Sequence, residues 1–94
     1  MLIRIVRMTF IPEKVETFLD IFNQSKKKIL EMEGCLYLEL WRDLHEENVF
    51  VTHSHWESEA ALNNYRDSEF FGKVWEQTKT LFTEKPMAFS MERV

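Results

Sequence analysis

The sequence predicts an α+β, ferredoxin-like fold with the element order β-α-β-β-α-β and a four-stranded antiparallel sheet. Apolar side chains alternate in four segments and recur at helical spacing in two others, and a short polar turn joins the two middle alternating segments. In this arrangement the helices cover one face of the sheet. A chain of 94 residues is expected to form one domain, residues 1–94.

The first predicted strand spans residues 2–10, which are rich in β-branched and aromatic side chains. Pro12 then suits the first turn of a helix, where the backbone donor that proline lacks would be unpaired anyway. The helix is expected to end at Gly34, since glycine readily adopts the left-handed conformation of a C-terminal cap. The predicted helix carries one apolar stripe, formed by Val15, Phe18, Leu19, Phe22, Ile29 and Leu30.

Residues 35–42 and 49–56 form a predicted antiparallel hairpin around the polar turn 43–48. Alternation assigns the side chains of each strand to two faces. In the first strand the expected sets are Leu36, Leu38 and Leu40 facing the helices, and Cys35, Tyr37, Glu39 and Trp41 facing away. In the second strand they are Phe50, Thr52, Ser54 and Trp56, and Val49, Val51, His53 and His55.

A broken helix is predicted from about Ser58 to Phe82. Ser58 suits the N-cap of its first part, and Ser68 can cap a further turn. Pro86 ends the connection, and residues 87–94 alternate again as the last strand.

Both faces of the predicted hairpin carry apolar or aromatic side chains, although the helices can cover only one. Burying each such side chain stabilises by about 1.5–3 kcal/mol, so an identical chain is expected to cover the second face. The sequence therefore predicts a homodimer. Its interface is expected to include Tyr37, Glu39, Val51 and His53.

Charge and composition exclude some classes of function. The net charge is -4, with 16 acidic against 12 basic residues, which is unlike a nucleic-acid binder. The one basic cluster, Lys26 to Lys28, is expected to be a solvated helix face. A single cysteine, Cys35, suits a reducing cytoplasm. No stretch approaches the roughly 20 apolar residues of a membrane span, so a cytoplasmic protein is expected.

His53 and His55 share a strand face and are expected to lie roughly 7 Å apart, from the rise of a β-strand. With Cys35 or Glu39 they could form a zinc site. The favoured interpretation is a polar part of the dimer interface, whose association would depend on pH. No metal site is therefore predicted, and the sequence shows no motif for a cofactor.

The candidate catalytic residues are Trp56 and Tyr65. Trp56 ends a strand on the face assigned to the helices, where it is either a core residue or a wall for a flat substrate. Tyr65 could offer its hydroxyl to a phenol or only pack in the core. The other candidate pocket residues are Thr52, Ser54, Phe71 and Trp75.

The segments EGCLYLELWRD and HWESEAALNNYRDSEFF resemble the antibiotic biosynthesis monooxygenase (ABM) superfamily of dimeric α/β barrels, over essentially the whole chain. The most specific match is Trp56-Glu57-Ser58, followed by Ala60, Ala61 and Leu62, then Ser68 and Phe71. Members of that family oxidise polycyclic phenols with oxygen and without metal or flavin, act on quinols, or degrade haem.

The resemblance implies a cofactor-independent monooxygenase that acts on a quinol-like or phenolic aromatic. A non-catalytic domain that binds a small molecule is the alternative. Tyr65 and Phe70 stand where the common pattern has histidines. In the haem-degrading branch, Trp56 would match a tryptophan, but Val6 replaces an asparagine and Trp75 a haem-ligating histidine. Haem is therefore expected to bind weakly if at all.

Overall fold

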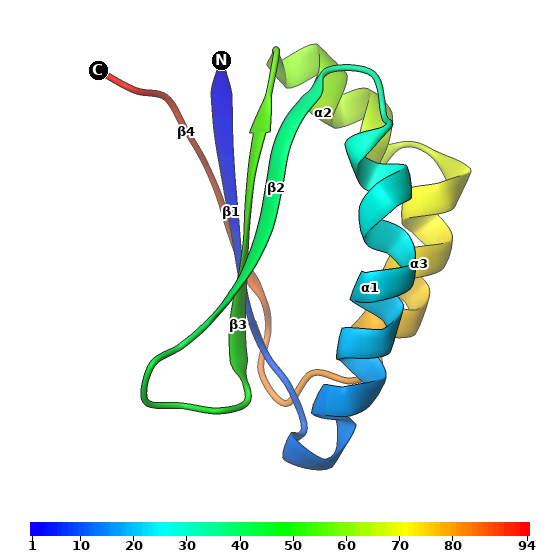
Figure 1. The fold of residues 1–94 in the computed structure, drawn as a ribbon, viewed down its shortest axis with the longest axis vertical. Coiled ribbons are helices and arrows are strands. Elements are labelled where there is room, and N and C mark those ends of the chain that lie inside the picture. Colours follow the sequence, from blue (N-terminus) through cyan, green and yellow to red (C-terminus); the bar gives the residue numbers. More distant parts are fainter.

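The computed structural model describes all 94 residues, Met1–Val94. An antiparallel four-stranded sheet packs against a layer of helices (Figure 1). The elements are β1 (Leu2–Thr9), η1 (Pro12–Lys14), α1 (Val15–Leu30), β2 (Cys35–Arg42), β3 (Val49–Trp56), α2 (Glu59–Arg66), α3 (Glu69–Lys79) and β4 (Met87–Met91). The strand order β2-β3-β1-β4 is that of a ferredoxin-like sheet, which confirms the predicted fold class.

The first helix differs at both ends from the prediction. Pro12 begins a short 3-10 turn, and the α-helix ends at Leu30, before Gly34. Gly34 has φ 85°, in the left-handed region, but it lies in the turn that leads into β2. Its carbonyl accepts a hydrogen bond from the backbone amide of Glu57 at 2.8 Å. A Cβ atom here would collide with that of Ala61 on α2, so glycine also permits a close approach.

The broken helix before the last strand is confirmed as α2 and α3. The hydroxyl of Ser58 accepts a hydrogen bond from the amide of Ala61 at 3.1 Å. The hydroxyl of Ser68 accepts one from the amide of Phe71, also at 3.1 Å. Each serine therefore satisfies an amide that the first turn of its helix would leave unpaired.

The start of β2 departs from strict alternation. Cys35 pairs with Trp56 and Tyr37 with His55, so the register shifts by one residue between them. Leu36 is the extra residue of this bulge and is 53% exposed, whereas Cys35 packs against the core. The predictions that Leu36 faces the helices and that Cys35 shares the face of Tyr37 are therefore wrong. An extra residue in one strand reverses the alternation on one side of it.

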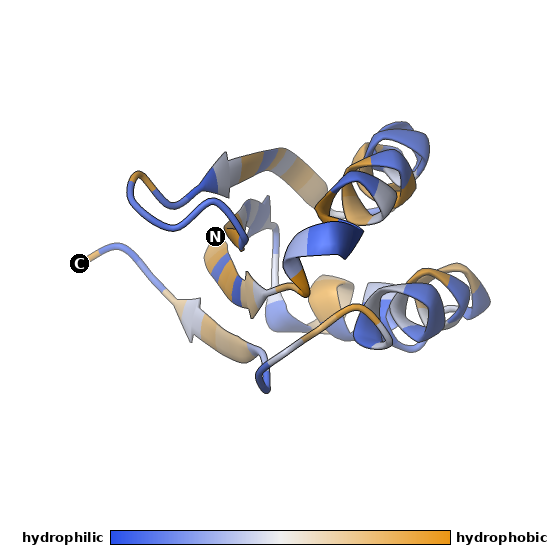
Figure 2. Ribbon diagram, turned by 90° about the horizontal axis from the view of Figure 1, so that it is seen from below, coloured by the Kyte–Doolittle hydropathy of each residue, from blue (hydrophilic) through white to orange (hydrophobic).

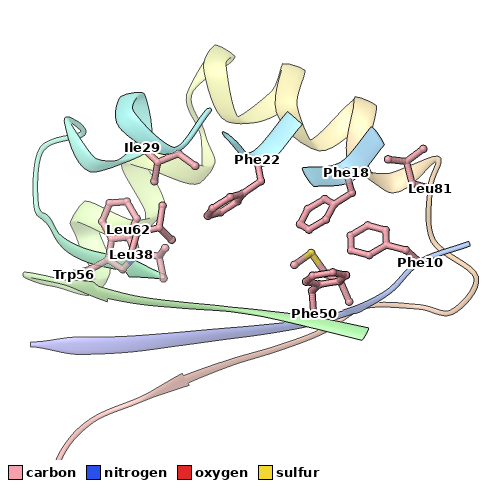
Figure 3. Packing of buried hydrophobic residues seen from close by; sticks show 10 residues of the cluster. Phe10, Phe18, Phe22, Ile29, Leu38, Phe50, Trp56, Leu62 and Leu81 are labelled. Atoms are coloured by element: carbon pink, nitrogen blue, oxygen red, sulfur yellow. The ribbon is translucent and has the colours of Figure 1, made fainter. Parts of the chain in front are cut away.

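The hydrophobic core lies between the sheet and the helices (Figure 3). At one end Phe10 stacks on Phe18, with ring centroids 4.1 Å apart, and Phe50 packs against both. At the other end Trp56 and Leu62 are buried. The sequence elements that meet here are far apart in the chain, so the core holds the two halves of the fold together.

The helices cover one face of the sheet only, and no helix lies on the other (Figure 2). This second face is called the open face here. Its residues include Ile5, His53 and Phe89, which are paired across β1, β3 and β4. Trp41 and Phe89 are each 45% exposed, which is unusual for large apolar side chains grouped on one face. No helix combines the length and apolar character that a membrane span requires.

Candidate functional site

A cavity of about 330 Å³ lies between the covered face of the sheet and the helices. Small-molecule sites are typically about 300–1,000 Å³, so this cavity has room for a small aromatic ligand. Most of its lining is apolar. All six residues singled out from the sequence line it: Thr52, Ser54, Trp56, Tyr65, Phe71 and Trp75. The exposed residues Arg66 and Ala88 are also part of the lining, so the cavity opens to solvent beside β4.

Trp56 is almost fully buried, at 1% exposure. Its indole Nε1–H donates a hydrogen bond to the hydroxyl oxygen of Ser54 at 3.0 Å. The two side chains share a face because they are two positions apart on β3. The indole donor is therefore already occupied, whereas the hydroxyl proton of Ser54 can be donated to a ligand.

Four rings form a continuous aromatic wall along the cavity. Trp56 stacks on Tyr65 with centroids 5.0 Å apart and an interplanar angle of 21°. Tyr65 meets Phe71 edge-on at 5.0 Å, and Phe71 lies nearly parallel to Trp75 at 6.0 Å. Because such pairs add about 0.5–1.5 kcal/mol each beyond their buried area, the wall is a rigid surface for a flat ligand.

Tyr65 offers the cavity a phenol that stays protonated. Burial raises the pKa of this phenol far above its usual range, and the thiol of Cys35 adds to the shift because a thiolate would repel a phenolate. The backbone carbonyl of Tyr65 accepts a hydrogen bond from the hydroxyl of Ser68 at 2.6 Å. Its phenol remains available to a ligand, as a hydrogen-bond donor and not as a base.

Two arginines in the lining were missed in the sequence. Arg4, the third residue of β1, is on the covered face, opposite Ser54 on β3 and Ser90 on β4. Its Nη1 donates to the hydroxyl of Ser90 at 2.9 Å. Arg66 ends α2. The signal for Arg4 was its position: alternation places it on the same face as Val6 and the other inward side chains of that strand.

The histidines lie outside this cavity, on the open face. The Nε2 atoms of His53 and His55 are 3.1 Å apart, and Tyr37 stacks on His55 at 4.6 Å. The Nδ1 atom of His53 is buried without a hydrogen-bond partner. Cys35 is on the opposite face, and no group of three or more His, Cys, Asp or Glu side chains is placed to hold a metal ion. The alternative zinc site therefore lacks a third ligand.

A family model described as antibiotic biosynthesis monooxygenase matches residues 1–77. This range includes β1 to β3, α1, α2 and the four residues of the aromatic wall. The chain belongs to the antibiotic biosynthesis monooxygenase family. No curated protein matches it in sequence.

Solved structures share the fold over the full length of this ABM protein. An antibiotic biosynthesis monooxygenase superposes with a TM-score of 0.94 at 22% identity, covering 100% of this chain and 99% of the other. A conserved protein from Methanosarcina mazei gives 0.93 at 19% identity, covering 99% and 93%. A Mycobacterium tuberculosis protein gives 0.91 at 16% identity, covering 99% and 94%. At these identities the likeness concerns the fold.

The cavity of this ABM protein can hold an aromatic molecule and donate hydrogen bonds to its oxygen atoms. The donors are the hydroxyl groups of Thr52, Ser54 and Tyr65 and the two guanidinium groups. The lining contains no carboxylate and no histidine, so it lacks the side chains that most often act as a general base near neutral pH.

Proposed function

We propose that this protein is a cofactor-independent monooxygenase that oxidises a quinol-like or phenolic aromatic in the cavity. The observation that carries the proposal is the aromatic wall, which includes the phenol of Tyr65 and lines a largely apolar cavity that Ser54 also lines. Membership of the ABM family supports it. The partly exposed rings of Tyr65, Phe71 and Trp75 serve as the surface on which the substrate stacks, and the almost fully buried Trp56 holds the ring of Tyr65 in place.

In the proposed reaction the ionised phenol supplies the electrons itself. A phenol ring carbon that carries hydrogen becomes a quinone carbonyl with one atom of dioxygen, and the other oxygen atom leaves as water. The four electrons come from the ring. Tyr65 and Ser54 donate hydrogen bonds to the substrate oxygen, whose negative charge they stabilise. Since the lining has no carboxylate or histidine, the phenol proton passes to water, which favours acidic phenols.

Oxygen consumption tests this proposal. Chelator-treated protein would be mixed with reduced quinones and polycyclic phenols without added metal or flavin. The expected result is one dioxygen consumed per quinone formed, with one atom of labelled oxygen found in the product. No uptake on any such substrate would contradict the enzyme proposal and favour the alternative, a non-catalytic domain of the same fold that binds a small molecule.

We also propose that residues 1–94 form one cytoplasmic domain that dimerises through the open face. The support is the exposed apolar surface there, of which Trp41 and Phe89 are part. Light scattering at micromolar concentration should give twice the mass of the chain. Trp41→Glu should give a monomer, because it would bury a charge in the interface. Leu44→Glu is the control, since Leu44 is also exposed but lies in the turn after β2. A monomeric wild-type protein would refute the dimer.

A further inference from the structure

We propose that the cavity selects aromatic carboxylates, with Arg4 and Arg66 binding the carboxylate while the aromatic wall holds the ring. This inference rests on the proposed function, because it assumes that the cavity binds the substrate. It narrows the substrate class to phenolic or quinol-like aromatics that carry a carboxylate group.

Arg4 occupies a position where an apolar residue would be expected. It is the third residue of β1 and faces the helices, between Ser54 and Ser90 in the register of the sheet. The hydroxyl of Ser90 accepts only one of the five N–H donors of its guanidinium. Arg4 is half-buried and lines the cavity, and its remaining donors have no hydrogen-bond partner in the protein, so they can donate to solvent or to a ligand.

Neither arginine of the cavity has an acidic partner. The ion pairs of the protein join Arg7 to Glu46 at 3.7 Å and Lys73 to Glu69 at 3.4 Å. Burial lowers the pKa of Arg4, and the positive charge of Arg66 lowers it further. Two positive groups that line one cavity repel each other, and an anion bound between them would remove that cost.

A structural role explains Arg66 more readily than Arg4. Arg66 is at the last turn of α2, where a cation is favoured by the helix dipole, so by itself it would indicate no ligand. Arg4 is in a strand and has no such role. Both guanidinium groups line a cavity that is apolar apart from a few hydroxyl groups. This combination indicates a ligand with one charged end and one apolar end.

The chemistry of the guanidinium group indicates a carboxylate. Its planar fork of donors can bind both oxygens of a carboxylate at once. Most of the remaining lining, including Phe22, Ile29 and Leu38, offers apolar contacts. A flat ring that carries one carboxylate would place its charge at the arginines and its ring against the partly exposed rings of Tyr65, Phe71 and Trp75.

The test compares two probes of the same size, 2-naphthoate and the neutral 2-naphthamide, by calorimetric titration of the full chain. Wild-type protein is expected to bind naphthoate at least about 10-fold more tightly than naphthamide. Arg4→Gln should weaken naphthoate binding by about 10–100-fold, as expected for a lost charge-assisted hydrogen bond, and change naphthamide binding by less than about 2-fold. Arg66→Gln should act in the same direction with a smaller loss.

Arg7→Gln is the matched control, because Arg7 is on the same strand but on the open face, beside Val51. It should leave both affinities unchanged. Arg4→Lys should restore part of the preference for naphthoate, which shows that charge and not folding is at issue. Circular dichroism of each variant checks the fold.

Equal binding of the two probes by wild-type protein, or an equal loss of both in Arg4→Gln, would overturn this inference, as would binding of neither. The proposed oxidation is judged separately. Oxygen uptake on a neutral quinol would leave it standing even if naphthoate is not preferred. Absent turnover on every phenol would refute it without affecting the binding comparison.

Discussion

Tyr65→Phe separates the catalytic use of a hydroxyl group from its structural use. The substitution removes one oxygen atom and keeps the ring that stacks on Trp56 at 5.0 Å and meets Phe71 at 5.0 Å. The hydrogen bonds at Tyr65 to Ser68 use the backbone carbonyl of Tyr65, so they survive the change.

The structure predicts different magnitudes for stability and turnover. A hydroxyl group in a protein hydrogen bond typically contributes about 0.5–1.5 kcal/mol to stability, and its loss here should cost less than that. A hydrogen bond to a charged oxygen is worth about 1.5–3 kcal/mol. If Tyr65 donates to the phenolate as the reaction proceeds, kcat should fall by about 10–100-fold.

The assay measures oxygen consumption on a reduced quinone, together with urea unfolding of the same preparations. Tyr37→Phe is the control, because Tyr37 is a tyrosine on the open face, stacked on His55. Turnover by Tyr65→Phe equal to that of the wild type would refute the role of the hydroxyl. A loss of stability larger than the increase in activation free energy would show that the hydroxyl is structural.

The pH dependence of the oxidation rate provides a second test of the role of Tyr65. Because burial raises the pKa of its phenol, Tyr65 stays protonated throughout the neutral range. The wild-type rate should therefore rise with pH along the ionisation of the substrate phenol. Substrates of different acidity should shift the midpoint of that rise, and a midpoint that is the same for all of them would instead indicate a titrating group of the protein.

Three further predictions concern packing and protonation. Trp56→Phe should weaken binding of aromatic ligands and lower the free energy of unfolding by about 1–3 kcal/mol, measured in urea, since it removes buried area and the hydrogen bond to Ser54. Gly34→Ala should cost about 2–4 kcal/mol from left-handed strain and the collision with Ala61, and adding Ala61→Gly should recover part of it; no recovery would show that the collision is unimportant. Burial lowers the pKa of His55 below 6.5, and the neighbouring histidine lowers it further. The unfolded chain therefore binds the proton more tightly than the folded chain, and stability should fall as the pH drops below 6.5. A His55→Gln variant should show a weaker fall in stability, and a fall identical to that of the wild type would contradict this.

Local pattern explains why most of the fold could be predicted. Alternation, helical spacing and the N-cap serines are properties of neighbouring residues, and they located all four strands and the break between α2 and α3. The prediction failed at the start of β2, where one extra residue interrupts the alternation of side chains between the two faces. The bulge at Leu36 places Cys35 on the covered face, and no local feature of the sequence marks it.

The candidate site, too, could be predicted from the sequence only in part. By itself the sequence determined that Trp56 faces the helices and that Tyr65 follows it on the next helix, because the chain connects them through one short turn. Only the tertiary structure decided that Arg4 reaches Ser90 and shares a cavity with Arg66. The physical reason is sequence separation: Arg4 and Ser90 meet because β4 returns to the edge of the sheet beside β1, and such a contact depends on the packing of the whole chain.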